Sequence, residues 1–124
     1  MSSYNIETKC IQSGYEPGNG EARVLPIYQS TTFKYASSEH MGKLFDLEAS
    51  GYFYTRLANP TNDAVAGKIC DLEGGVAAML TSSGQAASFY AIMNIAEAGD
   101  HIVCASSLYG GTYNLFAHTI RKMG

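Results

Sequence analysis

The sequence predicts an α/β protein that contains the beginning of an open, mostly parallel sheet. Two apolar runs, residues 76–80 and 101–105, have the length and composition of buried strands. Helical patterns separate and follow them, and strand–helix–strand–helix is the order in which open α/β sheets are built. Because two strands are too few for a parallel sheet covered on both faces, we expect the fold to be incomplete in this chain.

The first half of the chain shows no sustained hydrophobic period and is rich in Ser, Thr, Tyr and Gly. Pro26 argues against a central strand over residues 25–33, and a short helix is expected at residues 38–49. Long segments with so little regular structure usually wrap another surface or serve a function. We therefore expect residues 1–59 to form an arm, and residues 60–124 to form the start of the α/β domain.

The second half carries clearer helix signals. Asn59 is a good N-cap, Pro60 suits the first helical position, and Gly74 ends this helix in the usual way. A second helix is expected at residues 85–96, where the scarcity of polar side chains predicts burial on most sides. A third helix is expected after Gly110 and its neighbouring glycine.

Composition excludes several classes of partner. The 124 residues carry a formal net charge of -3, so the field of the whole molecule attracts neither nucleic acid nor an acidic membrane. The three cysteines form no C-x-x-C pair, and the N-terminus lacks the basic and apolar stretches of a signal peptide, so we expect a reducing, cytoplasmic setting. The three histidines are isolated, and no metal site is predicted.

The turn at residues 81–84 is a candidate anion site. It joins a predicted strand to a predicted helix whose first backbone N–H groups lack intrahelical partners. Gly84 would let a phosphate approach the backbone closely. The same residues also fit a tight turn selected for packing. The dinucleotide and triphosphate fingerprints, G-x-G-x-x-G and G-x-x-x-x-G-K-[ST], are both absent.

Two further features could contact a ligand. In an extended segment Tyr54 and Arg56 share a face, and a phenol beside a guanidinium suits a phosphate dianion. A surface arginine beside a packed tyrosine is the alternative. Tyr109 follows the second predicted strand and precedes two glycines, at the end of the sheet where open α/β folds bind ligands. Its ring could lie flat against a planar ligand, or be partly buried in an ordinary loop.

Four motifs occur in order along the chain: Tyr54–Thr61, Leu72–Gly75, Ser83–Ala87 and Leu108–Tyr113. Together they resemble the Cys/Met-metabolism family of pyridoxal-phosphate (PLP) enzymes, and the closest likeness is to the O-acetylhomoserine sulfhydrylases. The likeness covers essentially the whole chain. It implies an aspartate-aminotransferase-like fold, PLP fold type I, in a homodimer or homotetramer whose arm, residues 1–59, reaches a neighbouring subunit.

The resemblance also implies a cofactor, pyridoxal 5'-phosphate, and roles for particular residues. Tyr54 and Arg56 would bind the cofactor phosphate in the partner's active site. Tyr109 would stack on the pyridine ring and assist proton transfer, as the catalytic residue of this part of the chain. The phosphate of the chain's own cofactor would be held by the turn residues Ser83, Gly84 and Gln85.

The implied reaction is γ-replacement on O-acetylhomoserine: acetate leaves, and sulfide or methanethiol adds to give homocysteine or methionine. The family's Schiff-base lysine and substrate-carboxylate arginine would come later than this chain extends, so the chain alone is expected to be inactive. Methionine γ-lyases are similar but typically have a cysteine where Gly111 stands. They and the cystathionine γ-synthases remain alternatives, and a non-catalytic phosphate-binding α/β module is an alternative from another class.

Overall fold

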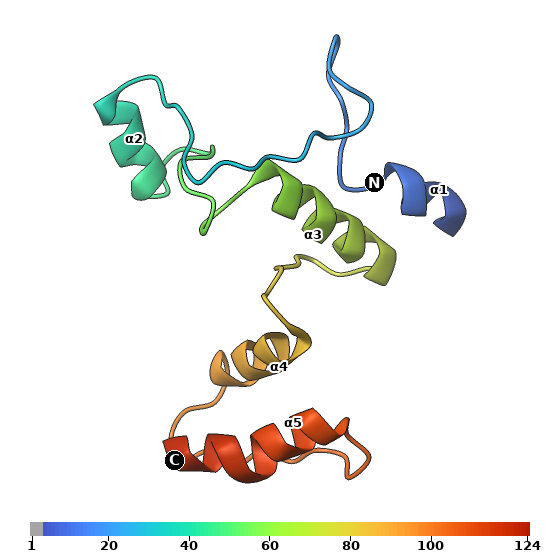
Figure 1. Ribbon diagram of the computed structural model, residues 1–124, viewed down its shortest axis with the longest axis vertical. Helices are drawn as coiled ribbons and strands as arrows, with labels where there is room; N and C mark the ends of the chain where they lie inside the picture. The colour runs from blue at the N-terminus through green and yellow to red at the C-terminus, as the bar shows by residue number, and fades with distance from the viewer. Residues whose placement is uncertain (1–3) are drawn as a thin grey trace. The chain divides into compact units, whose positions relative to one another are not determined.

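The computed structural model describes residues 4–124, which form two compact units divided between Met79 and Leu80 (Figure 1). The first unit contains three helices: α1 (Ile6–Gln12), α2 (Ser38–Phe45) and α3 (Pro60–Glu73). The second contains α4 (Gly84–Met93), α5 (Gly110–Asn114), a π-helical turn η1 (Leu115–Thr119) and a 3₁₀ turn η2 (Ile120–Met123). No helix of the described residues is long and apolar enough to cross a membrane.

Helix α3 confirms the predicted helix in the second half of the sequence. Asn59 has an extended backbone, and its side chain accepts a hydrogen bond of 2.9 Å from the N–H of Thr61. Pro60 is the first helical residue, and Gly74 ends the helix with φ +67°. These are the cap and stop that the sequence indicated.

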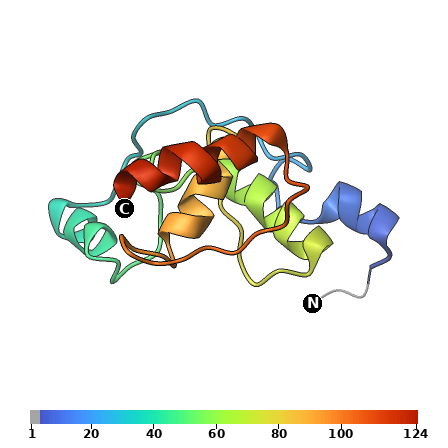
Figure 2. The same ribbon diagram turned by 90° about the horizontal axis from the view of Figure 1, so that it is seen from below.

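Helix α1 was not predicted, and α3 holds it in place within the first unit (Figure 2). The Lys9 ammonium lies 2.9 Å from a carboxylate oxygen of Asp71, and the Ser13 hydroxyl donates to the other oxygen. Just after the helix, Gly14 adopts φ +89°, where a Cβ would lie 2.1 Å from the carbonyl oxygen of Ala64. Only glycine permits so close an approach of this backbone to α3.

Helix α2 begins where the sequence predicts but ends earlier. The Ser37 hydroxyl caps it by accepting from the N–H of His40 at 3.1 Å. The predicted helix over residues 38–49 stops at Phe45, because the chain turns there and Leu47 adopts φ +59°. A left-handed residue cannot continue a right-handed helix.

The second unit contains the other two predicted helices with altered bounds. Helix α4 begins at Gly84, capped by the Ser83 hydroxyl that accepts from the N–H of Ala86 at 3.1 Å, and ends three residues before the predicted end at residue 96. The helix expected after Gly110 starts there as α5 and continues through η1 and η2. Helices α4 and α5 contact one another within this unit (Figures 1 and 2).

The prediction of two strands in the second half of the sequence is wrong. Residues 76–80 and 101–105 join no ladder, and across residues 4–124 the only β-pairing is an antiparallel bridge between Thr32 and Tyr54. Val76 and Val103 are fully exposed rather than buried. A strand needs a neighbour to take its backbone hydrogen bonds, and these runs have none among the described residues.

The core is very small. Leu44, Ala66 and Asn59 are the buried residues of the described chain, and α4, predicted to be buried on most sides, buries none of its residues. The accessible surface is 9989 Å², whereas a compact protein of this mass exposes about 6,500 Å². Two separate compact units of these sizes would still expose only about 7,700 Å². The chain therefore exposes more surface than compact units of these sizes do, and its exposed side chains include large apolar ones such as Ile11, Val76 and Val103.

Candidate functional site

Tyr54 and Arg56 lie close together in the first unit. The guanidinium carbon of Arg56 is 5.0 Å from the centroid of the Tyr54 ring, within cation–π range. Both side chains line an open hollow of about 390 Å³. The rest of its lining comes from Thr55, which lies between them in the chain, and from the segment that faces them: Tyr28, Gln29, Ser30 and Thr31.

The local backbone explains this arrangement. Around the Thr32–Tyr54 bridge, Phe33 donates to the Phe53 carbonyl at 3.2 Å and Thr55 donates to the Thr31 carbonyl at 2.9 Å. Beyond the bridge the chain leaves the extended conformation: the Tyr54 carbonyl accepts from the N–H groups of Leu57 at 3.0 Å and Ala58 at 3.1 Å, and residues 55–57 form a turn. The prediction of an extended segment is therefore wrong, but the turn still places the Arg56 guanidinium over the Tyr54 ring, so the two side chains lie together.

The charge on Arg56 is available to an anion. Within residues 4–124 the salt bridges join Lys9 to Asp71 and Lys43 to Glu39, and no carboxylate pairs with Arg56. The Arg56 side chain is also exposed. A free guanidinium fork with a phenol beside it has the donors that a phosphate dianion accepts. The first unit thus contains two side chains whose donors fit a phosphate.

The start of α4 provides a second set of donors, in the other unit. The Ser83 hydroxyl accepts a hydrogen bond from the N–H of Ala86. The N–H groups of Gly84 and Gln85 belong to the first turn and have no intrahelical acceptor. A Cβ at Gly84 would meet no atom within 4 Å, so the space in front of this turn is open. The helix dipole adds partial positive charge there.

Tyr109 lies beside this turn. A Cβ at Gly111 would be 2.7 Å from the side-chain nitrogen Nε2 of Gln85 and 2.8 Å from the ring of Tyr109, so these three residues meet at one point. The Thr112 hydroxyl also donates to the Gln85 side chain at 3.3 Å. Tyr109 keeps 79% of its surface exposed, and its ring is free to contact a ligand.

The structure thus brings the predicted residues together as two groups. Ser83, Gly84, Gln85 and Tyr109 gather in residues 80–124, whereas Tyr54 and Arg56 lie in the first unit. Each group could contact the phosphate or ring of a planar phosphorylated cofactor. Their functional roles stay predictions.

Sequence reasoning missed the residue that fixes the Tyr54–Arg56 segment. Asn59 was recognised only as a helix cap, but its side-chain amide also donates to the Tyr28 carbonyl at 3.1 Å and to the Thr55 hydroxyl at 3.0 Å. Only 3% of its surface is exposed. No local pattern could reveal a partner 31 residues away.

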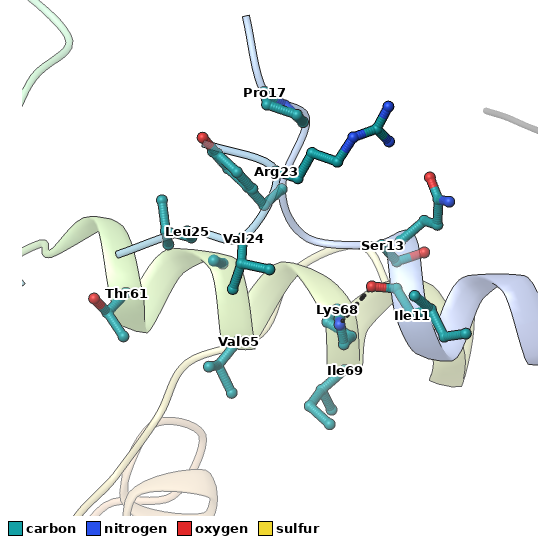
Figure 3. A pocket seen from close by; sticks show the side chains of 13 residues that line it. Ile11, Ser13, Pro17, Arg23, Val24, Leu25, Thr61, Val65, Lys68 and Ile69 are labelled. Carbon is teal, nitrogen blue, oxygen red and sulfur yellow. Dashed lines mark hydrogen bonds between the residues drawn. The ribbon is translucent and has the colours of Figure 1, made fainter. Parts of the chain in front are cut away.

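A larger cavity of about 480 Å³ lies along α3 and contains none of the predicted site residues (Figure 3). It lies between α3 and residues 11–25, and Lys68 at its edge donates to the carbonyl of Ile11 at 3.1 Å. Val24, Leu25 and Val65 make much of its wall apolar. Its lining also includes Arg23 and Lys68, and Lys68 is already bonded to the carbonyls of Cys10 and Ile11.

Comparison with known proteins identifies the class of protein to which this chain belongs. Residues 7–124 match the family described as Cys/Met metabolism PLP-dependent enzyme. Because the match covers nearly the whole chain, the chain belongs to this family. This confirms the resemblance drawn from the four motifs.

Individual relatives agree with this assignment. The chain is 46% identical over 123 residues to the O-acetyl-L-homoserine sulfhydrylase of Leptospira meyeri, and 49% identical over 122 residues to that of Corynebacterium glutamicum. In both cases the matched region covers 98% of this chain but only 28% of the relative. The chain therefore spans less than a third of the length of these curated relatives.

Solved structures show the same fold. An O-acetylhomoserine (thiol)-lyase from Campylobacter jejuni, whose crystal structure contains pyridoxyl-lysine monophosphate, superposes with a TM-score of 0.92 at 34% identity. The metB protein of Corynebacterium glutamicum superposes with a TM-score of 0.87 at 35% identity. Each match covers 98% of this chain and 30% of the other. The fold is that of the N-terminal part of a PLP fold type I enzyme, as predicted.

Proposed function

We propose that this chain acts as the front part of a longer PLP-dependent enzyme that carries out γ-replacement on O-acetylhomoserine. Sulfide or methanethiol would displace acetate, to give homocysteine or methionine. The observation that carries the proposal is the 46–49% identity, over almost the whole chain, to proteins named O-acetyl-L-homoserine sulfhydrylase. The presence of Gly111, where methionine γ-lyases typically have a cysteine, supports the same choice.

The residues present fit pyridoxal 5'-phosphate. Arg56 and Tyr54 offer an unpaired guanidinium and a phenol, and the start of α4 offers free N–H groups beside an open glycine. Tyr109 presents an exposed ring near the Gln85 side chain, where it would stack on the pyridine and move a proton at the substrate. When bound, the cofactor supplies an electron sink for negative charge at the substrate's α-carbon.

The two groups of residues would serve different active sites. We propose that residues 1–59 form an arm that carries Tyr54 and Arg56 to a neighbouring subunit of a homodimer or homotetramer. Ser83, Gly84, Gln85 and Tyr109 would serve the site of their own subunit. The large apolar surface of the chain supports this proposal, because it needs cover from other protein. A cytoplasmic location would suit an enzyme of this metabolism.

An assay of the full-length protein tests the reaction. O-acetylhomoserine with sulfide is expected to give homocysteine and acetate, whereas methionine alone gives no appreciable methanethiol. Release of methanethiol or of an α-keto acid as the main product would instead indicate a γ-lyase. Turnover only with cysteine as the sulfur donor would indicate a cystathionine γ-synthase.

The non-catalytic phosphate-binding module is disfavoured by the small core. A self-sufficient module of 124 residues requires a substantial buried interior, and here the buried apolar side chains are Leu44 and Ala66 among the described residues. The module predicts that the isolated chain is a monomer with a sharp thermal transition. The enzyme proposal predicts an isolated chain that aggregates or melts without cooperativity.

A further inference from the structure

Among the described residues Asn59 is the one polar residue that is buried. Both the oxygen and the nitrogen of its side-chain amide form hydrogen bonds. Its oxygen accepts from the N–H of Thr61 and so caps α3. Its nitrogen donates to the Tyr28 carbonyl at 3.1 Å and to the Thr55 hydroxyl at 3.0 Å. One side chain therefore links three segments: the start of α3, residue 28 in the arm and residue 55 between Tyr54 and Arg56.

Neighbouring bonds strengthen this junction. The Thr55 hydroxyl, which accepts from Asn59, donates in turn to the carbonyl of Ser30. The Thr61 hydroxyl accepts from the Tyr28 N–H at 2.9 Å and donates to the Pro26 carbonyl at 3.3 Å. The two ends of the segment from residue 28 to residue 59 are thus fastened to each other at the first turn of α3.

We infer that Asn59 is a positioning residue, which holds the Tyr54–Arg56 pair in the register that phosphate binding requires. The inference rests on the proposed function, since it takes Tyr54 and Arg56 as phosphate ligands. The physical reason is that Thr55, fixed on one side by Asn59 and on the other by the Thr31 carbonyl, leaves the two flanking side chains little freedom. A ligand pair held in place before binding loses less conformational entropy on binding.

Only an amide at this position can make all three bonds. Aspartate or serine could still accept from the Thr61 N–H and cap α3 about as well as asparagine. Aspartate could not donate to the Tyr28 carbonyl or the Thr55 hydroxyl, because an ionised carboxylate only accepts. Serine is too short to span the same partners, and it adds no charge near a bound phosphate.

The test uses the full-length apoprotein, titrated with PLP and separately with pyridoxal, which lacks the phosphate. Asn59→Ser is the main variant, and Thr55→Val, which removes the hydroxyl that Asn59 contacts, is the second. Both are expected to weaken PLP binding about tenfold, since each bond lost is worth roughly that much or less. Pyridoxal affinity is expected to stay within about twofold, because it makes no use of the phosphate ligands.

A matched control tests whether the loss of any helix cap in the arm is enough to weaken PLP binding. Ser37→Ala removes the cap of α2, in the same arm but away from the Tyr54–Arg56 pair, and is expected to leave PLP affinity unchanged. A double-mutant cycle adds a second discriminator. In an Arg56→Ala background, Asn59→Ser is expected to cost less than about twofold more, because the two residues act through one interaction.

Several outcomes would overturn the inference. It fails if Asn59→Ser binds PLP as tightly as the wild type, if it loses PLP and pyridoxal affinity alike, or if it adds its full effect on top of Arg56→Ala. If the wild-type protein binds no PLP at all, the proposed function fails and the inference fails with it. Failure of the inference alone is recognised by a wild type that binds PLP and an Asn59→Ser variant that matches it.

Discussion

The guanidinium of Arg56 lies over the ring of Tyr54, 5.0 Å from its centroid, and both side chains face the same open hollow. The ring therefore orients the guanidinium without neutralising it. Lysine could keep the charge but has neither the planar fork nor the stacking surface.

Arg56→Lys in the full-length protein is accordingly expected to weaken PLP binding by about tenfold, and Arg56→Ala by more. Equilibrium dialysis of the apoprotein against PLP measures both. The exposed Arg23, which lines the separate cavity along α3, provides a control. An Arg23→Lys variant that lost as much affinity as Arg56→Lys would show that the effect is not local.

Gly111 is expected to control the position of Tyr109. A Cβ there would come within 2.8 Å of the Tyr109 ring and 2.7 Å of the Gln85 amide, so Gly111→Ala and Gly111→Cys must displace at least one of these side chains. If Tyr109 moves protons and stacks on the pyridine ring, both variants should lower kcat by about tenfold or more and should also weaken PLP binding. Steady-state kinetics and PLP titration measure the two effects.

The control for this prediction is Gly110→Ala, since a Cβ at Gly110 would meet nothing within 4 Å. It should leave kcat close to that of the wild type. Equal losses at both glycines would mean that helix α5, and not the Tyr109 ring, is what the substitutions disturb.

Gly14→Ala is expected to detach α1 from α3. Gly14 has φ +89°, and a Cβ would lie 2.1 Å from the Ala64 carbonyl oxygen. Gly20 has a similar φ of +82° but open space around it, so it isolates the cost of the backbone conformation alone. In the full-length protein we expect Gly20→Ala to cost about 1–2 kcal/mol and Gly14→Ala about 3 kcal/mol or more in free energy of unfolding. Urea denaturation measures both, and equal costs would contradict the close approach.

The stability that Asp71 of α3 gains from Lys9 and Ser13 is also expected to depend on pH. The hydrogen bond from the Ser13 hydroxyl, together with the Lys9 ammonium, lowers the pKa of Asp71 below its usual value. A lowered folded-state pKa means that the ionised form stabilises the fold above the unfolded pKa of about 3.9, and that this contribution disappears as the pH falls through the folded pKa.

Asp71→Asn, which keeps the shape but not the charge, should therefore melt below the wild type at pH 5–7 and converge with it as the pH falls below about 4. Thermal melts across this range test the prediction. Glu39→Gln, which breaks the exposed pair with Lys43, should show almost no difference at any pH. A wild-type advantage that grew as the pH fell would contradict the assignment.

Local sequence signals were sufficient where a helix carries its own start and stop. Asn59 and Gly74 bound α3 as predicted, and Ser83 caps α4 at the expected turn. Helix α1 escaped prediction because its cap residue, Asn5, makes no side-chain bond, and its stability comes from the Lys9–Asp71 pair, 62 residues apart in sequence. Such a contact leaves no local pattern.

The strand predictions were wrong because a strand depends on neighbours that the local sequence does not show. The apolar runs at residues 76–80 and 101–105 have the composition of buried strands, but a strand is completed only by neighbours. Among the described residues they have none, and Val76 and Val103 stay exposed. Likewise, the sequence indicated the types of residue at the site, but not the buried bonds of Asn59 that hold Tyr54 and Arg56 together.

The central claim is that Arg56 of one subunit and Tyr109 of another complete a single active site, and mixed oligomers test it most directly. Full-length Arg56→Ala and Tyr109→Phe variants, each nearly inactive alone, would be unfolded, mixed in equal amounts and refolded together. Each hybrid dimer would then contain one intact site, so activity should recover to about a quarter of the wild-type value. A mixture that stays as inactive as its two components would contradict the account, because it would place both residues in the same subunit's site.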